Sequence, residues 1–131
     1  MPFKKHCAMS GNRLLLDTNT ILYVLDGNET LATFLNEKEL YVSVITELEL
    51  LSYKKITTKE IRIISDFLAQ VNIINITDEV KSTTIDLRRK SNLKLPDSII
   101  GATSLTLNIP LVTSDRQMAS VPGLNIVLFE I

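Results

Sequence analysis

The sequence predicts an α/β fold, a three-layer α/β/α sandwich with a mostly parallel central sheet. Short apolar runs with strand character alternate with segments of helical periodicity along the 131 residues. This strand–helix–strand order favours parallel strands with helices on both faces of the sheet. No internal repeat, low-complexity segment or linker interrupts the order. A chain of this length forms one domain, which we place at residues 13–131, after a flexible tail at residues 1–12.

Apolar patterning defines the expected elements of the first half. Strands are predicted at residues 13–17 (RLLLD), a compact apolar run that ends on an acid, and at residues 40–44 (LYVSV). The capping-box pattern Thr57-x-x-Glu60 opens one helix, because each side chain can bond the other residue's backbone N–H. Apolar residues at helical spacing predict further helices at residues 18–25, 30–36 and 46–53.

The second half continues the alternation. Residues 71–76 (VNIINI) alternate as a half-buried strand does, and residues 78–91 read as a polar helix with a narrow apolar stripe. Pro96 suits the first turn of the next helix, which we place at residues 97–107. The remaining predicted elements are a strand at 109–113 (IPLVT), a helical turn at 115–119 and a final strand at 126–129.

Composition excludes several classes of protein. The formal net charge is -1 and the pI about 5.8, so any grip on a polyanion must be local or supplied by metal ions. The single cysteine, Cys7, cannot form an internal disulfide, and no Cys/His cluster has zinc-ligand spacing. This composition fits a reducing cytoplasm. No apolar run reaches the roughly 18–20 residues of a membrane-spanning helix.

Four acids stand at predicted strand ends or helix starts: Asp17, Glu49, Asp97 and Asp115. In parallel α/β sheets ligands bind outside the carboxyl ends of the strands, so these side chains can converge on one edge. Clustered carboxylates repel one another unless a cation neutralises them. Oxygen ligands without His or Cys favour Mg²⁺ or Mn²⁺. The remaining acids fall on expected loops or polar helix faces and read as solvated surface.

Each of these acids also has a purely structural interpretation. Asp17 is a good helix N-cap, Glu49 completes a capping box with Thr46, and the other two complement helix dipoles. Glu47 is the rival to Glu49, since residues two apart on a helix do not share a face. The leucines favour Glu49 mildly if they face the sheet: Leu48, Leu51 and, less firmly, Leu50.

Four blocks then occur in the order LLLDTNTIL, SVITELELL, LPDSIIGATSL and IPLVTSD. Together they resemble the PIN domain, and they are most similar to the VapC-type toxins of bacterial toxin–antitoxin pairs. The resemblance runs from Leu14 to the final strand. The family's Thr-x-x-Glu-Leu pattern falls on Thr46, Glu49 and Leu50, which favours Glu49 over Glu47. Gly101 departs from the alanine that is common there.

The resemblance implies a metal-dependent endoribonuclease that uses Mg²⁺ or Mn²⁺ and hydrolyses RNA phosphodiesters. It also implies a cognate antitoxin and a homodimer. The implied metal ligands and catalytic residues are Asp17, Glu49, Asp97 and Asp115. The side chains expected to orient these carboxylates are Asn19, Thr46, Thr113 and Ser114.

Two further groups of residues have open interpretations. The basic residues Arg88, Arg89 and Lys94, with Lys90 between them, either contact substrate phosphates or form a solvated helix end. A second group either forms the dimer surface or belongs to the core: Leu31, Phe34, Leu35, Phe67 and Leu68.

Three competing functions each require particular residues at particular positions. A phospho-accepting receiver domain would have paired acids after the first strand, where DTN stands, and a lysine near the end of the last strand, where Phe129-Glu130 stands. A haloacid-dehalogenase-type phosphatase would have an acid at Asn19. A non-catalytic PIN-like module that binds RNA or protein would lack one or more of the acids. All four acids are present, so the chain reads as catalytically competent.

Overall fold

The computed structural model describes residues 3–4 and 12–130. Within these residues one sheet runs in the order β1-β6-β5-β2-β3-β4. Every neighbouring pair of strands is parallel except β1 and β6, which are antiparallel. The strands are β1 (Phe3–Lys4), β2 (Arg13–Leu16), β3 (Glu39–Ser43), β4 (Asn72–Ile74), β5 (Leu111–Thr113) and β6 (Ile126–Phe129). The predicted mostly parallel sheet is therefore confirmed.

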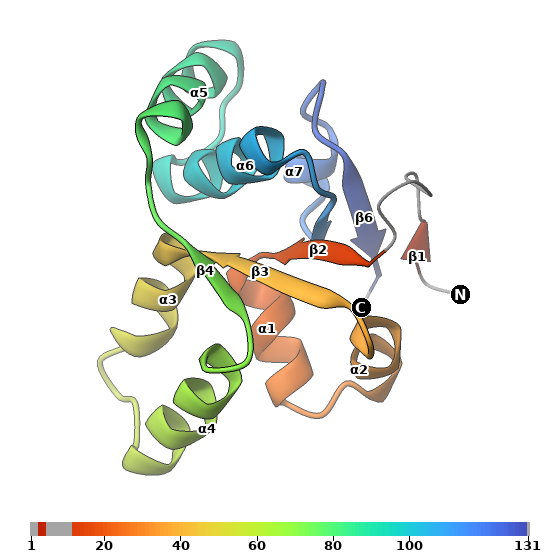
Figure 1. The fold of residues 1–131 in the computed structure, drawn as a ribbon, viewed down its shortest axis with the longest axis vertical. Coiled ribbons are helices and arrows are strands. Elements are labelled where there is room, and N and C mark those ends of the chain that lie inside the picture. Colours follow the sequence, from red (N-terminus) through yellow and green to blue (C-terminus); the bar gives the residue numbers. More distant parts are fainter. Residues whose placement is uncertain (1–2, 5–11, 131) are drawn as a thin grey trace.

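Helices cover both faces of the sheet and complete three layers, as predicted (Figure 1). One face carries α1 (Thr18–Leu25), α2 (Glu29–Leu35), α3 (Val44–Leu51) and α4 (Thr58–Leu68). The other face carries α5 (Asp78–Lys90), α6 (Leu95–Leu107) and α7 (Arg116–Ala119).

The leucine run of β2 shows how the sequence builds these layers. Leu14 and Leu16 pack into the core on the side of α1, α2 and α4, whereas Leu15 packs into the core on the side of α5 and α6. All three are at most 1% exposed. Successive strand residues point to opposite faces, and a central parallel strand is covered on both, so its sequence is continuously apolar rather than alternating.

The predicted element boundaries hold within two residues, and the start of α3 is the one that affects the site. Ser43 caps this helix, because its hydroxyl accepts a hydrogen bond from the Ile45 N–H at 3.1 Å. Thr46 is therefore the third residue of α3 rather than its cap, and Glu49 lies in the second turn. The predicted Thr46–Glu49 capping box is wrong, since a serine three residues earlier already satisfies the free N–H groups.

The expected orientation of the α3 leucines is also wrong for two of them. Leu50 is buried, but Leu48 is 57% exposed and Leu51 is 36% exposed. The buried stripe of α3 is Thr46 and Leu50, one helical turn apart. Glu49 and Leu48 lie off this stripe. The leucines of α3 therefore do not favour Glu49 over Glu47.

The capping box that opens α4 is confirmed. Thr57 accepts from the Glu60 N–H at 3.1 Å, and Glu60 accepts from the Thr57 N–H at 3.0 Å. Both bonds lie within one turn of chain, so sequence alone specifies them.

The apolar residues considered for a dimer surface belong to the core. Leu31, Leu35 and Leu68 are 1%, 5% and 7% exposed, and Phe34 and Phe67 pack against the same buried cluster. The interpretation as dimer surface is therefore wrong for this set. An amphipathic helix has the same sequence pattern whether its own sheet or a second chain covers it.

Gly101 lies where α5 and α6 pack against each other. A Cβ added there would lie 3.3 Å from Leu87 Cδ1, so the glycine permits this close approach at a modest cost in helix propensity. The segment 1–12 includes β1 at Phe3–Lys4. Residues 1–2 and 5–11, with Cys7 among them, lie outside the described residues. Across the described ranges the helices are all too short or too polar to cross a bilayer.

Candidate metal centre

Asp17 lies between the end of β2 and the start of α1, where it caps the helix. The residue is 8% exposed, and both oxygens of its side chain accept hydrogen bonds. Oδ1 accepts from the Thr20 N–H at 2.9 Å and from the Thr20 hydroxyl at 2.6 Å, while Oδ2 accepts from the Thr113 hydroxyl. Burial raises the pKa of Asp17, the Asp115 charge adds to this, and the hydrogen bonds from Thr113 and Thr20 oppose it.

Thr20 ties Asp17 to the neighbouring strand. Its hydroxyl is fully buried and lies 2.9 Å from the backbone oxygen of Val112 in β5, as well as 2.6 Å from Asp17. A threonine hydroxyl has one proton, so the two acceptors compete for it. The sequence analysis did not single out Thr20. The available signal was its position three residues after an N-cap acid, within reach of that carboxylate.

Thr113, at the end of β5, links two of the acids. Its hydroxyl donates to Asp17 and accepts from the Asp115 N–H at 3.0 Å. Asp115 in turn caps α7 by accepting from the Gln117 N–H at 2.8 Å. Because β2 and β5 are parallel neighbours, their carboxyl ends bring Asp17 and Asp115 to the same edge of the sheet.

Glu49 reaches this edge from α3 through Thr18. The Thr18 hydroxyl donates to Glu49 Oε1 at 2.6 Å and lies 3.2 Å from the buried hydroxyl of Thr46. Thr18 follows Asp17 directly, so this hydrogen bond joins α1 to α3. Thr18 was also absent from the predicted site, because its partner lies 31 residues further along the chain.

The charges of Asp17, Glu49 and Asp115 all act on Asp97, and we call these four carboxylates the acid group. Asp97 lies in the first turn of α6 and is half-buried. Burial raises its pKa most, followed by the charges of Asp115, Asp17 and Glu49, whereas Lys94 lowers it. The charge of Glu49 acts on Asp97, and the Glu49 carboxylate accepts from the hydroxyl of Thr18, the neighbour of Asp17. This geometry favours Glu49 over Glu47 as a residue of the site.

The acid group fits a divalent cation by charge and by donor chemistry. Within residues 3–4 and 12–130 no protein group donates a hydrogen bond to the Asp97 carboxylate, and the charge of Lys94 opposes those of the three other acids. All the available ligands are oxygens, the donors that Mg²⁺ and Mn²⁺ prefer. No three His, Cys, Asp or Glu side chains in the described part already lie close enough to ligate one ion. Repulsion between the like charges favours a larger distance between the carboxylates than metal ligation requires.

The other predicted site residues have mixed positions. Asn19 is exposed and bonds none of the acids among the described residues, and Ser114 is half-exposed at the rim of a cavity. Arg88 donates to the Leu93 backbone oxygen at 3.0 Å, which closes the loop between α5 and α6. Arg89 is exposed on α5. Lys94 is the one of these cations that acts on an acid of the site, Asp97.

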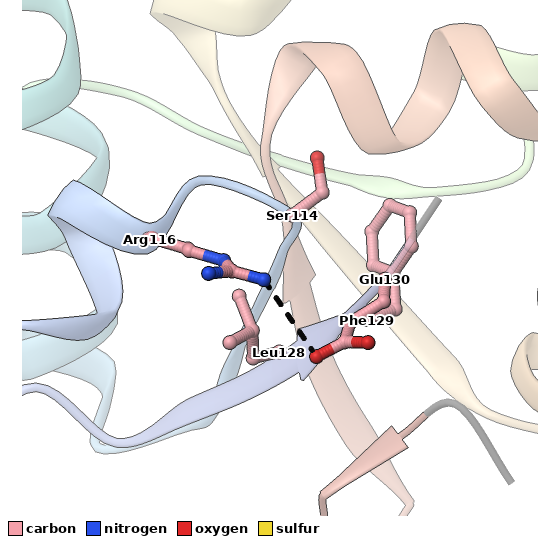
Figure 2. Close-up of a pocket in the computed structure, with 5 residues that line it drawn as sticks. All are labelled: Ser114, Arg116, Leu128, Phe129 and Glu130. Carbon is pink, nitrogen blue, oxygen red and sulfur yellow. Dashed lines mark ion pairs between the residues drawn. The ribbon is translucent and has the colours of Figure 1, made fainter.

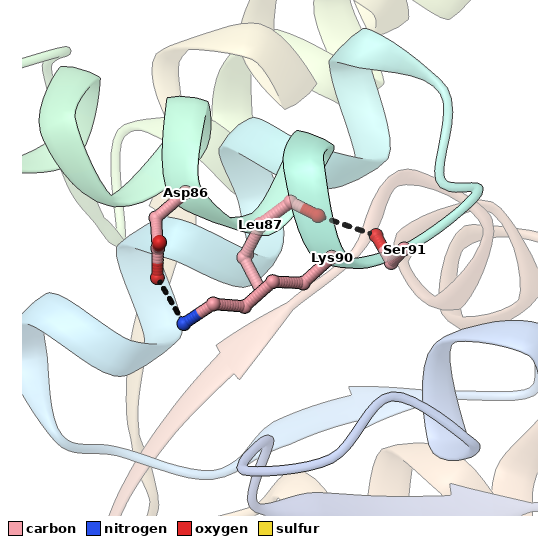
Figure 3. Close-up of polar contacts among 4 residues, drawn as sticks. All are labelled: Asp86, Leu87, Lys90 and Ser91. Carbon is pink, nitrogen blue, oxygen red and sulfur yellow. Dashed lines mark hydrogen bonds and ion pairs between the residues drawn. The ribbon is translucent and has the colours of Figure 1, made fainter.

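The end of α5 is held by local contacts (Figure 3). Lys90 pairs with Asp86 at 3.0 Å, and the Ser91 hydroxyl donates to the Leu87 backbone oxygen at 2.7 Å. Lys90 is thus engaged with Asp86, one helical turn back along α5.

Replacing Thr20 with valine tests the link between Asp17 and β5. Valine keeps the shape but removes the hydroxyl, leaving buried acceptors of Asp17 and Val112 with one partner fewer. We expect unfolding in urea to show a loss of about 1–3 kcal/mol. Thr20→Ser, which keeps the hydroxyl, is the control and should lose less. Equal stability of the valine variant and the wild type would contradict the role given to this hydroxyl.

Several solved structures with a similar fold are toxin–antitoxin complexes. A chain of a toxin–antitoxin complex from Klebsiella pneumoniae superposes with a TM-score of 0.78 at 29% identity, covering 90% of this chain and 99% of that chain. A chain of VapBC2 from Rickettsia felis, bound to promoter DNA, gives 0.76 at 19% identity and the same coverage of both chains. A chain of VapBC-5 from Mycobacterium tuberculosis gives 0.68 at 18% identity, covering 92% and 99%. At these lower identities the likeness shows the fold.

Sequence comparison agrees with the structural one. No curated protein matches the chain with significance, but the PIN domain profile matches residues 14–124. That range begins in β2 and includes all four acids. It also agrees with the four blocks in which the sequence resembles this family. The chain belongs to the PIN domain family.

Proposed function

We propose that this protein is a metal-dependent endoribonuclease that hydrolyses RNA phosphodiester bonds and acts as the toxin of a toxin–antitoxin pair. The observation that carries the proposal is the environment of Asp97. Its half-buried carboxylate faces the charges of Asp17, Glu49 and Asp115, and its pKa is raised. Repulsion among these carboxylates destabilises the fold unless a cation binds between them. Groups with perturbed pKa values of this kind concentrate at functional sites.

The four acids are the proposed ligands of Mg²⁺ or Mn²⁺. A bound divalent ion supplies Lewis acidity that activates water and offsets charge on the phosphate oxygens. The chain's own residues prepare the site. Thr20 and Thr113 hold both oxygens of Asp17 in place, and Thr18 directs Glu49. A carboxylate has about four lone-pair sites, so Asp17 can accept these bonds and still bind a cation.

The family resemblance implies two partners, a cognate antitoxin and a second copy of this chain. The toxin–antitoxin complexes in which similar structures were solved support the antitoxin. Both partners would need exposed apolar surface. One depression lies between α1 and α4 and includes Leu22, Leu25 and Ile63. Another lies between α5 and α6 and is lined by Ile76, Ile85 and Leu95 among others. We propose these as the partner surfaces. A monomeric mass by light scattering at micromolar concentration would contradict the homodimer.

The function is tested by incubating the purified protein with single-stranded RNA, with Mg²⁺ or Mn²⁺ and with EDTA. Cleavage within the strand that requires the divalent ion supports the proposal. A non-catalytic PIN-like module would bind the RNA and leave it intact under every condition. Intact RNA after incubation with excess protein and either metal would therefore sink the nuclease assignment.

Divalent ions are expected to raise the melting temperature of the wild type, because they bind the folded acid group and not the unfolded chain. At tenfold the Kd, binding stabilises by about 1.4 kcal/mol, which for this size is a shift of roughly 3–5 °C. Asp17→Asn should remove most of the shift. Asp66→Asn, an exposed change on α4, should retain it. An unchanged wild-type melt at millimolar Mg²⁺ and Mn²⁺ would rule out this site.

A further inference from the structure

A cavity of about 260 Å³ opens beside the acid site and is not used by the function proposed so far. It is lined by Ser114, Arg116, Leu128, Phe129 and Glu130. Figure 2 shows the Arg116 side chain extending across it towards Glu130 at the end of β6.

The sheet order places this cavity next in line along the carboxyl edge. The strands β3, β2, β5 and β6 are consecutive parallel neighbours. Glu49, Asp17 and Asp115 follow the first three of them, and the cavity lies at the end of the fourth. Ser114 and Arg116 also flank Asp115 in the chain. A strand of RNA lying along this edge, with one phosphate at the acids, would pass over the cavity with a neighbouring phosphate.

Arg116 is suited to bind that phosphate. Its side chain is 83% exposed, and its ion pair with Glu130 spans 4.0 Å between exposed groups. Such a pair contributes little to stability, so the guanidinium can exchange its partner readily. A guanidinium also matches the geometry of phosphate oxygens with two parallel N–H bonds. Of the basic residues considered above for substrate contacts, Arg88 already donates to the Leu93 backbone oxygen and Lys90 already pairs with Asp86.

The charge of the site gives a second reason to expect that Arg116 binds RNA. The acid site repels RNA, and the chain as a whole has a formal charge of -1. Steering of a polyanion to this edge therefore depends on individual cations next to the acids. Lys94 is the N-cap residue of α6 and its charge acts on Asp97, whereas Arg116 follows Asp115 in the chain and pairs with Glu130 after β6.

We propose that Arg116 binds an RNA phosphate next to the one that is cleaved, and that Glu130 competes with the RNA for its guanidinium. This inference rests on the proposed RNA substrate. It assigns opposite effects to the two members of one ion pair: Arg116 strengthens RNA binding and Glu130 weakens it.

The experiment measures binding of a fluorescently labelled single-stranded RNA by anisotropy. All variants are made in the Asp97→Asn protein so that the probe stays intact. Arg116→Gln should weaken binding roughly three- to tenfold and lower the slope of log K against log salt by about 0.7, as expected for one lost phosphate contact on a single strand. Glu130→Gln should strengthen binding by a similar factor. Arg62→Gln and Glu79→Gln, matched charge changes at exposed positions on α4 and α5, should change it little.

Cleavage kinetics provide the second readout. In the protein that retains Asp97, Arg116→Gln should raise KM with little change in kcat, and Arg116→Lys should restore part of the loss. Unchanged binding in both variants, or a shift of both in the same direction, would overturn the role of Arg116. The two proposals fail in different ways. If the wild type leaves the RNA uncut, the nuclease assignment is refuted. If Arg116→Gln cuts the RNA normally with an unchanged KM, only the role of Arg116 is refuted.

Discussion

Replacing Asp97 with asparagine is expected to abolish RNA cleavage while the fold stays intact. Asparagine preserves the shape of the side chain but removes the negative charge that would bind the cation. The loss of activity should be at least about 10²–10³-fold, comparable to removal of one strong electrostatic contact in an active site. Without metal the variant should melt at the same temperature as the wild type or higher, because one of the mutually repelling charges is gone.

The pH dependence of the metal-free melt checks the same point independently. Folding raises the pKa of Asp97, so the folded protein binds this proton more tightly than the unfolded chain does. Asp97 therefore favours the folded state below the ordinary carboxyl pKa of 3.8, and this contribution is lost as the pH rises through the raised pKa. Asp97→Asn should remove this part of the pH dependence, and the exposed Asp66→Asn should not. Cleavage by Asp97→Asn at the wild-type rate would end the catalytic assignment.

Glu49→Gln is expected to lower cleavage by roughly 10²-fold or more, whereas Glu47→Gln should leave it near the wild-type rate. A neutral amide is a poor ligand for Mg²⁺, and the charge of Glu49 acts on Asp97 in the folded protein. The amide oxygen can still accept the hydrogen bond from Thr18. Because Ser43 and not Thr46 caps α3, neither change removes the capping hydrogen bond, and both variants should melt near the wild-type temperature.

The two glutamates form a matched pair, with the same chemical change two residues apart on one helix. RNA cleavage at saturating Mg²⁺ and thermal melting without it are measured for both. Loss in Glu47→Gln alone would show that the orientation of α3 is misassigned. Equal loss in both would mean that the site depends on the total charge of this helix and not on one ligand.

Much of the fold can be predicted because the signals are local. The continuous apolar run of β2, the capping box of Thr57 and Glu60, and Pro96 in the first turn of α6 each specify their element within a few residues of chain. Three of the four acids could be located for a related reason. Asp17, Asp97 and Asp115 follow a strand or lie in the first turn of a helix, and parallel strands bring their carboxyl ends to one edge. Glu49 lies in the second turn of α3, and it was favoured by the resemblance to the PIN domain rather than by its position.

The supporting hydrogen bonds could not be predicted in this way. Thr20 contacts a backbone oxygen 92 residues away, and Thr113 bonds a carboxylate 96 residues away. A threonine in the first turn of a helix has the same local appearance with or without such a partner. Arg116 is similar, since its position beside a cavity at the end of β6 depends on the order of strands in the sheet.

The sequence by itself determined the fold class, the order of elements and the acids that form the candidate site, since periodicity, caps and strand-end positions depend on neighbouring residues. Only the tertiary structure decided which apolar faces are core, with Leu31, Leu35 and Leu68 buried while Leu48 is exposed. It also showed that Glu49 accepts from Thr18 and acts on Asp97, and it identified the threonines that bond Asp17 and Glu49. These outcomes depend on which segments contact one another in the folded protein. A contact between segments far apart in the sequence produces no periodic pattern of residues that could predict it.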